Sequence, residues 1–283
     1  MTNKSDPKPA GAEAPPATRS LILEQEIAAP PDEVWDALTT PAGIRRWLAL
    51  DAKVTPGASG SVWLSWGPGC EGEAPIHIWE PAERFGWTEG YGDDDDGRPI
   101  RVAIDFYIES REGSTVLRLV QSGFSASSDW DEMYDALKDG WTYFLFSLAF
   151  YFLEHRGQER RLVWRRVPTD LAREDIWERL GAGSLIGPAG NGDDAGVHIV
   201  IDERRPAEVV SSRKGYHFAA TLPDLNRSLL FVELEGQHVG LWLSTYGLDA
   251  KQAEDLQEAL DGRVEVLFGV GKHPGSSTES QSG

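Results

Sequence analysis

The sequence predicts an α+β protein in which an antiparallel sheet and a long helix form a first block and a second, smaller α+β block follows. Three observations carry this prediction. A strand-like segment at residues 21–27 runs directly into two short helical segments that begin at prolines. Apolar and polar residues alternate over residues 101–109, as in a sheet with one face in a core. A long helix with an apolar second half, at about residues 129–155, closes the first block.

Prolines mark the passage from the first strand into the helices. Pro30 and Pro31 stand where a helix start tolerates proline, and Asp32 and Glu33 carry favourable charges for the first turn. Pro41 begins a second helical turn. Apolar residues recur at helical spacing in both segments: Val34, Trp35 and Leu38, then Ile44, Trp47 and Leu48. We therefore expect two short amphipathic helices.

Strand-like runs separated by turn signals fill the interval up to the long helix. They are SVWLSW, APIHIWE, ERFGWTE, RVAIDFYIES and TVLRLVQSGF. The turn REGS between the last two indicates a hairpin. Alternation is clearest in the fourth run, where Val102, Ile104, Phe106 and Ile108 point one way and Arg101, Asp105 and Glu109 the other. One face of this sheet is expected to lie in the core.

The second block repeats the general order of elements. A strand, RLVWRRV, and a helix, REDIWERL, are followed by the Gly-rich stretch GAGSLIGPAGNGDDAG, which is interpreted as a flexible connection. The strands VHIVIDE, AEVVSSR, YHFAATL, LLFVELE and HVGLWLST come next, then a helix AKQAEDLQEAL and the run VEVLFGV. DEVWDAL (32–38) and EDIWERL (174–180) share their pattern, which indicates either a weak internal repeat or a chance likeness between amphipathic helices.

These patterns divide the chain into four parts. Residues 1–18 are rich in Pro, Ala and charge and are expected to be a disordered tail. Residues 20–156 form the first domain and residues 162–270 the second. Residues 272–283 form a second disordered tail.

Composition narrows the classes of partner. The net charge of -19 argues against nucleic acid and against anionic membrane surfaces, because both bind clustered Lys and Arg. Cys70 is the only cysteine, so no internal disulfide forms. The N-terminus lacks the apolar segment of a signal peptide, and the longest apolar run, residues 141–153, is shorter than the about 20 residues of a membrane span. A soluble cytoplasmic protein is expected.

Specific segments of the first block resemble a known family. They are IAAPPDEVWDALTTPAGIRRWL, IHIWEPAERFGW, LVQSGF and the pair Gly140–Trp141. Over about residues 20–156 the chain resembles the activator of Hsp90 ATPase homologue 1-like (AHSA1-like) domains of the bacterial-type SRPBCC, or START-like, superfamily. The resemblance implies a helix-grip fold, in which a curved antiparallel sheet wraps around the last helix. The second block shares only the order of elements, so it is expected to be a smaller α+β domain or a degenerate repeat of the grip.

The resemblance also implies a cavity between the sheet and the last helix, where an apolar small molecule would bind. The expected lining residues are Trp66, His77, Trp87, Phe106, Trp141, Phe144 and Leu148. The alternative is that these aromatic residues fill the core. For His77 the alternative is the outer face, because its neighbours Ile76 and Ile78 would then point inward.

The long helix has a second apolar face that one sheet leaves uncovered. It carries Tyr143, Phe146, Phe150 and Leu153. A helix that is apolar all round is normally buried all round. Either the second block or another subunit must cover these residues, and we expect the second block, because its chain begins directly after the helix.

Three functions remain open at this point. The first is non-catalytic binding of a hydrophobic small molecule or a protein partner. The family name implies a second, a co-chaperone that activates an Hsp90-type ATPase. The third is a cyclase- or hydrolase-like enzyme, which needs at least two convergent polar side chains in the cavity; His77, with Asp105 or Tyr107, is the only candidate set. The sequence predicts no catalytic residue or cofactor, because it has no phosphate-binding Gly motif and no G-x-S-x-G. It predicts no metal site, because nothing in the spacing of His198, His217 and His238 makes them converge.

Overall fold

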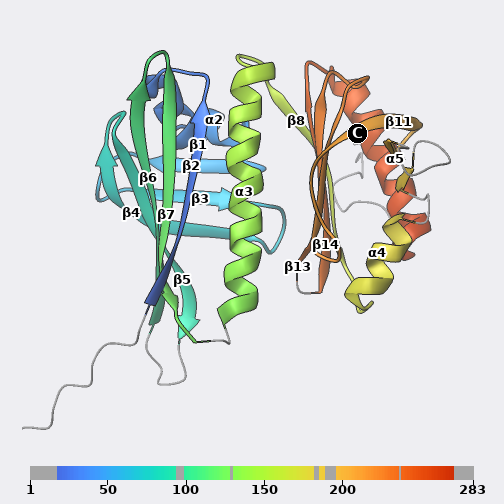
Figure 1. Ribbon diagram of the computed structural model, residues 1–283, viewed down its shortest axis with the longest axis horizontal. Coiled ribbons are helices and arrows are strands. Elements are labelled where there is room, and N and C mark those ends of the chain that lie inside the picture. The colour runs from blue at the N-terminus through green and yellow to red at the C-terminus, as the bar shows by residue number, and fades with distance from the viewer. Residues whose placement is uncertain are drawn as a thin grey trace, which may run out of the picture.

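The computed structural model describes residues 18–93, 99–127, 130–181, 185–188, 196–235 and 237–270. Two antiparallel sheets of seven strands each follow one another along the chain. The long helix α3 (Asp131–Glu154) stands between them (Figure 1). The two expected tails lie outside the described residues, apart from Thr18, which begins the first strand.

The first sheet has the strand order β1-β7-β6-β5-β4-β3-β2, so its first strand pairs with its last. Its strands are β1 (Thr18–Ile27), β2 (Asp51–Thr55), β3 (Ser61–Ser65), β4 (Glu71–Glu80), β5 (Arg84–Asp93), β6 (Pro99–Arg111) and β7 (Ser114–Ser125). β2 was not anticipated, because its residues DAKVT contain only one strongly apolar side chain that points inward.

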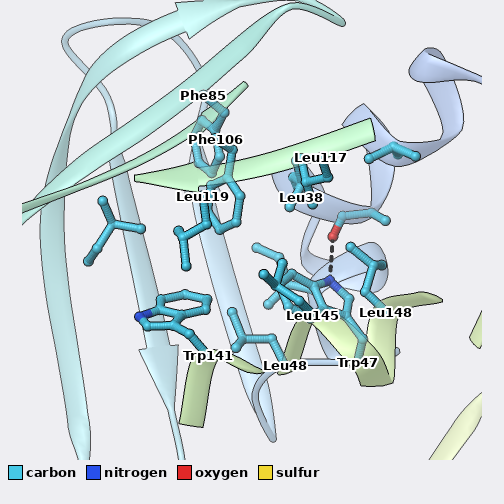
Figure 2. Close-up of a cluster of buried hydrophobic side chains, with 14 of the residues drawn as sticks. Leu38, Trp47, Leu48, Phe85, Phe106, Leu117, Leu119, Trp141, Leu145 and Leu148 are labelled. Atoms are coloured by element: carbon cyan, nitrogen blue, oxygen red, sulfur yellow. Dashed lines mark hydrogen bonds between the residues drawn. The ribbon is translucent and has the colours of Figure 1, made fainter. Parts of the chain in front are cut away.

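Two short helices connect β1 to β2, as expected: α1 (Pro31–Thr39) and α2 (Pro41–Arg45). Thr40 caps α2, since its hydroxyl oxygen accepts a hydrogen bond from the Gly43 N–H at 3.0 Å. The Trp47 indole N–H donates to the Ala37 carbonyl oxygen at 3.0 Å, which joins the end of α2 to α1 inside the core (Figure 2). The two helices thus close one end of the first core.

The second sheet repeats the topology of the first. Its order is β8-β14-β13-β12-β11-β10-β9, so again the first strand pairs with the last. The elements are β8 (Arg160–Pro168), α4 (Arg173–Gly181), β9 (Ile186–Pro188), β10 (Val197–Val200), β11 (Arg204–Arg213), β12 (His217–Leu222), β13 (Ser228–Glu235), β14 (His238–Tyr246) and α5 (Ala250–Phe268). The fold is therefore two helix-grip domains in tandem, the second with a shorter last helix.

Two expectations for the second domain were wrong. The Gly-rich stretch contains strand β9, which pairs with β10 over three residues, although residues 182–184 and 189–195 lie outside the described chain. The run VEVLFGV continues α5 instead of following it, because Val264 and Leu267 extend the apolar face begun by Leu256 and Leu260. The helix ends at Gly269, whose φ of 70° is left-handed.

Helix α3 is buried by both sheets. Trp141, Leu145 and Leu148 lie in the core of the first domain. On the opposite face, Tyr143 and Phe150 form a buried cluster with residues of the second sheet, namely Ala219, Leu229, Phe231 and Trp242. The Tyr143 and Phe231 rings stack with centroids 3.8 Å apart and planes inclined by 8°. The second domain thus covers this face, and Phe146 lies half-buried at its margin.

Leu153 corrects the expected interface, because it is 69% exposed. An α-helix has 3.6 residues per turn, so residues spaced three or four apart drift gradually around its axis. Leu153 lies in the last turn of α3 and points away from the second sheet. His155, two residues further along, contacts the second domain instead. Its ring stacks on that of Tyr246, with centroids 4.0 Å apart and planes inclined by 8°.

Polar contacts set how the second domain lies along α3. Carboxylates on α3 pair with cations of the second domain: Glu132 with Arg173 (2.7 Å), Asp139 with Arg213 (2.9 Å) and Glu154 with Arg227 (3.4 Å). Each pair is partly exposed, so each contributes at most about 1 kcal/mol. Their spacing from the first to the last turn of α3 fixes the register of the docked sheet.

Substituting Phe150 by Asp is expected to uncouple the two domains, because it would place a carboxylate in the buried apolar cluster that contains Phe231 and Trp242, with the Arg227 guanidinium only at its edge. The free energy of unfolding should fall by about 3 kcal/mol or more, and calorimetry should show two transitions. Leu153→Asp is the matched control and should change stability by about 0.5 kcal/mol at most. Equal melting curves for the two variants would contradict this interface.

The junction is also expected to weaken in mild acid through His155, which is 2% exposed. Burial lowers the pKa of His155 from its usual value of 6.5, so the unfolded chain binds this proton more readily than the folded chain. His155 therefore costs no stability above about pH 6.5, and stability is lost as the pH falls below that value. His155→Phe keeps a ring on Tyr246 and should flatten the dependence of Tm on pH between about 7 and 5.5. An unchanged slope would show that His155 is not responsible.

Candidate functional site

The interior of the first domain contains a cavity of about 10 Å³. It lies between the sheet and the α1–α2 end of the core, where Leu38, Ile44, Trp47, Leu48, Val62, Leu64, Phe85, Trp87 and Phe106 line it. This volume is about the minimum that holds one water molecule. In this conformation the grip is therefore closed.

Aromatic side chains occupy the space that the sequence assigned to a ligand. Trp87 packs on Phe106 with ring centroids 5.6 Å apart, and Trp141 of α3 packs on Phe106 at 5.8 Å. Leu148 is fully buried in the same cluster, part of which Figure 2 shows. These four predicted lining residues (Trp87, Phe106, Trp141 and Leu148) lie together between the sheet and the helix, where they fill the core. Whether they also contact a ligand stays a prediction.

Trp66 and Phe144 pack at the edge of the same core, where the Phe144 ring centroid lies 6.0 Å from that of Trp141. Both line a second cavity, of about 20 Å³, between the two domains. Trp66 is in the turn after β3, and Phe144 is on α3 close to Tyr143. The second sheet forms the opposite wall of this cavity through Phe231 and Trp242.

His77 is on the outer face of the sheet, so its assignment to the cavity was wrong. The strand register shifts between Ile76 and Ile78, and this bulge directs His77 across Gly86 on β5. His77 Nε2 lies 2.8 Å from Asp105 Oδ1 on β6, and His77 Nδ1 lies 3.0 Å from Thr88 Oγ1. A Cβ atom at Gly86 would lie 2.5 Å from the same Asp105 oxygen, so only glycine leaves room for this contact.

The enzymatic alternative required His77 and Asp105 to converge inside the cavity. The two side chains do meet, but on the solvent side of the sheet. Tyr107 is there as well, beneath the guanidinium of Arg118 at 4.6 Å. These groups therefore form an outer-face cluster and do not supply acid or base groups to the interior.

The polar group that does point inward is Gln121, which the sequence reasoning missed as a site residue. Gln121 is 0% exposed, and among the described residues neither its amide oxygen nor its amide nitrogen has a hydrogen-bond partner. It pairs in register with Leu21 on one side and Ile104 on the other, both buried. The alternation that turns Leu117 and Leu119 inward also turns Gln121 inward, and that signal was in the sequence.

Glu89 is a second polar side chain at this end of the core. It is half-buried and accepts hydrogen bonds from the Trp87 indole N–H and the Tyr91 hydroxyl, both at 2.9 Å. Tyr91 in turn contacts Trp130 at the start of α3, with ring centroids 6.4 Å apart. The interior of the first domain therefore changes from apolar near α1 and α2 to partly polar near the beginning of α3.

The half of α3 over this partly polar end is held by partly exposed contacts, among them the ion pairs of Glu132 with Arg173 and of Asp139 with Arg213. All buried residues of α3 lie at or after Trp141, and the first two turns rest on aromatic contacts such as that of Tyr134 with Phe124, at 5.4 Å. Gly140 separates the exposed half from the buried half, and a Cβ atom there would meet no atom within 4 Å. Glycine inside a helix is less stable than alanine by about 0.5–1 kcal/mol, so the helix is intrinsically weakest at this position.

The ranges that the structure describes contain neither a clustered set of metal ligands nor a membrane-spanning helix. Within those ranges, no group of three or more His, Cys, Asp or Glu side chains is arranged to hold a metal ion. The described helices include none that is long and apolar enough to cross a membrane.

Comparison with known proteins gives one family. Residues 28–152 match the model of the family described as activator of Hsp90 ATPase homolog 1-like protein. No curated protein matches the sequence.

Some similar solved structures match about half of this chain, and others match most of it. A Mesorhizobium loti protein, MLL2253, is 27% identical, with a TM-score of 0.43, and the match covers 49% of this chain and 98% of that chain. The Aha1 dimer from Colwellia psychrerythraea is 21% identical, with a TM-score of 0.41, and coverages of 49% and 99%. The di-domain ARO/CYC protein BexL of the BE-7585A biosynthetic pathway is 12% identical, with a TM-score of 0.41, and coverages of 88% and 95%.

The matched residues begin just before α1 and end in the last turns of α3, so they span the α1–α2 pair, strands β2 to β7 and the gripped helix. The first of the two helix-grip domains in this chain is therefore a member of the activator of Hsp90 ATPase homolog 1-like family.

Proposed function

We propose that the first domain binds an apolar small molecule that carries one polar group, and that Gln121 is the hydrogen-bond partner of that group. The observation that supports this proposal is the unpartnered amide of Gln121 in a wholly buried position. Leaving a buried amide unpaired costs about 1–3 kcal/mol, and a leucine would fill the same place without that cost. A ligand that pairs with the amide recovers the lost energy.

The surroundings of Gln121 define the class of ligand. Its strand neighbours Leu21 and Ile104 are apolar, and the rings of Phe106 and Trp141 pack together in the same core. Binding sites for small molecules generally combine such apolar walls with a small number of polar groups. The expected ligand is therefore mostly hydrocarbon, planar or aromatic, with a carbonyl, hydroxyl or amide group for Gln121.

Binding requires the domain to open, since the interior is filled. The first two turns of α3 have no buried residue, and Gly140 joins them to the buried half. We infer that residues 131–140 act as a lid over Gln121 and Glu89. The ligand would then select a minor open state and hold it, by its greater affinity for that state. An Hsp90-type co-chaperone and a cyclase- or hydrolase-like enzyme stay the alternative predictions.

Gln121→Leu is expected to separate stability from binding. Removing the unpaired amide should raise the free energy of unfolding by about 1–3 kcal/mol, while the affinity for an anilinonaphthalene fluorophore or a natural ligand should fall. Gln25→Leu is the control, because the Gln25 amide on β1 already donates to a backbone carbonyl. Fluorescence titration and urea unfolding measure the two quantities. A less stable Gln121→Leu protein with unchanged affinity would refute the role given to Gln121.

Gly140→Ala tests the lid. Alanine fits at this position, so it should stabilise the helix by about 0.5–1 kcal/mol and stiffen the proposed hinge. Stopped-flow mixing with the fluorophore should then show slower association than in the unaltered protein. Gly262→Ala on α5, where a Cβ atom also meets nothing within 4 Å, is the matched control and should leave the association rate unchanged. Equal rates in all three proteins would argue against an opening at Gly140.

A further inference from the structure

The cavity between the two domains is separate from the grip interior and has polar groups of its own. Its volume is about 20 Å³, which is room for one water molecule or one monatomic ion. Aromatic rings from both domains form the walls, among them Trp66 and Phe144 on one side and Phe231 and Trp242 on the other. A ligand here would contact both domains at once.

Arg160 brings a positive charge to this cavity. It is the first residue of β8, which follows the end of α3 by a short turn, and its guanidinium donates to the Ala49 carbonyl oxygen at 2.6 Å. No carboxylate of the described residues lies within 4.0 Å of the guanidinium nitrogens. Burial lowers the pKa of Arg160, and only the Tyr246 and Tyr143 hydroxyls act in the opposite direction. A guanidinium has five N–H donors, and Arg160 is half-buried, so donors other than the one that bonds Ala49 remain for a ligand or for water.

Hydroxyl groups lie beside this charge. Tyr143 and Ser244 both line the cavity, and Ser244 is 1% exposed. The cavity also has one carboxylate in its lining, Glu233, whose Oε1 accepts a hydrogen bond from the Trp242 indole N–H at 2.8 Å. The negative charge of Glu233 also acts on the Tyr143 hydroxyl, so an anion here must be held by Arg160 against that charge. The Tyr143 and Ser244 hydroxyls are hydrogen-bonded to each other, which leaves one hydroxyl proton of the pair for an anion beside Arg160.

We propose that this interdomain cavity binds a monatomic anion, chloride in the first place, held by the Arg160 guanidinium and the hydroxyls of Tyr143 and Ser244. The volume excludes an organic acid unless the aromatic walls separate. The anion would link β8 and β14 of the second domain to α3 and to the loop at Ala49 of the first. Its binding should therefore stabilise the arrangement of the two domains, independently of any ligand at Gln121.

The test is thermal unfolding at constant pH and ionic strength, with sodium gluconate replaced stepwise by sodium chloride. The Tm of the unaltered protein should rise saturably, by about 2–4 °C when chloride is about ten times its dissociation constant. Arg160→Gln should remove this rise. Arg161→Gln should keep it, because the neighbouring guanidinium bonds the Leu248 carbonyl instead. The same rise in all three proteins, or none in the unaltered protein, would overturn the proposal.

Crystals of the unaltered protein grown with bromide give a second measurement that does not depend on any variant folding. An anomalous peak within hydrogen-bond distance of the Arg160 guanidinium would support the anion site. A cavity with no anomalous signal would show that water fills it and would overturn the proposal. Crystals grown in acetate distinguish a monatomic anion from a carboxylate. Acetate bound at Arg160 would contradict the limit that the cavity volume sets on the size of the anion.

Discussion

The two-sided burial of α3 is the constraint on which the rest of this structure depends. A single sheet covers one side of a helix, and α3 carries large apolar residues on both. The second domain resolves this by placing its own sheet on the face that carries Tyr143 and Phe150. Because of that docking, the two helix-grip domains share one helix as a common wall, with α3 in the middle (Figure 1).

The same helix also links the two proposed sites. Its second half is held on both sides by aromatic contacts, whereas its first two turns have no buried side chain. The second half is therefore packed more tightly than the first, which is held by partly exposed ion pairs such as Glu132–Arg173 and would have to break them to open. The second half would position the interdomain cavity beside Arg160, and the first half would control access to the grip interior. In this account, the second half of α3 stabilises the domain junction, and its first two turns open the first domain to a ligand.

Much of the fold could be predicted from the sequence, because burial leaves a periodic trace. Alternation identified β6 and β7, and prolines identified the starts of α1 and α2. The apolar character of α3 on all sides predicted that something covers it. β9 was not predicted, because a strand of three residues inside a Gly-rich stretch is too short to show apolar–polar alternation.

The candidate site was harder to predict, since it depends on local departures from regular geometry. His77 was assigned to the cavity although alternation along β4 already allowed the outer face, and the structure buries Ile76 and exposes His77. Trp66 and Phe144 pack against the first core and also line an interdomain cavity, which could not be predicted because the docking of the second domain creates it. Gln121 was identifiable, since it continues the inward alternation of β7, but it was read only as part of a family motif.

Native mass spectrometry of the protein purified from its own cells tests the central claim most directly, that the first domain opens to bind an apolar small molecule. At low activation energy the account predicts a complex with one small molecule of a single mass per chain. High activation energy should release that molecule and leave the bare chain. A bare chain at every energy would mean that the aromatic side chains simply fill the core, and it would contradict the proposed function.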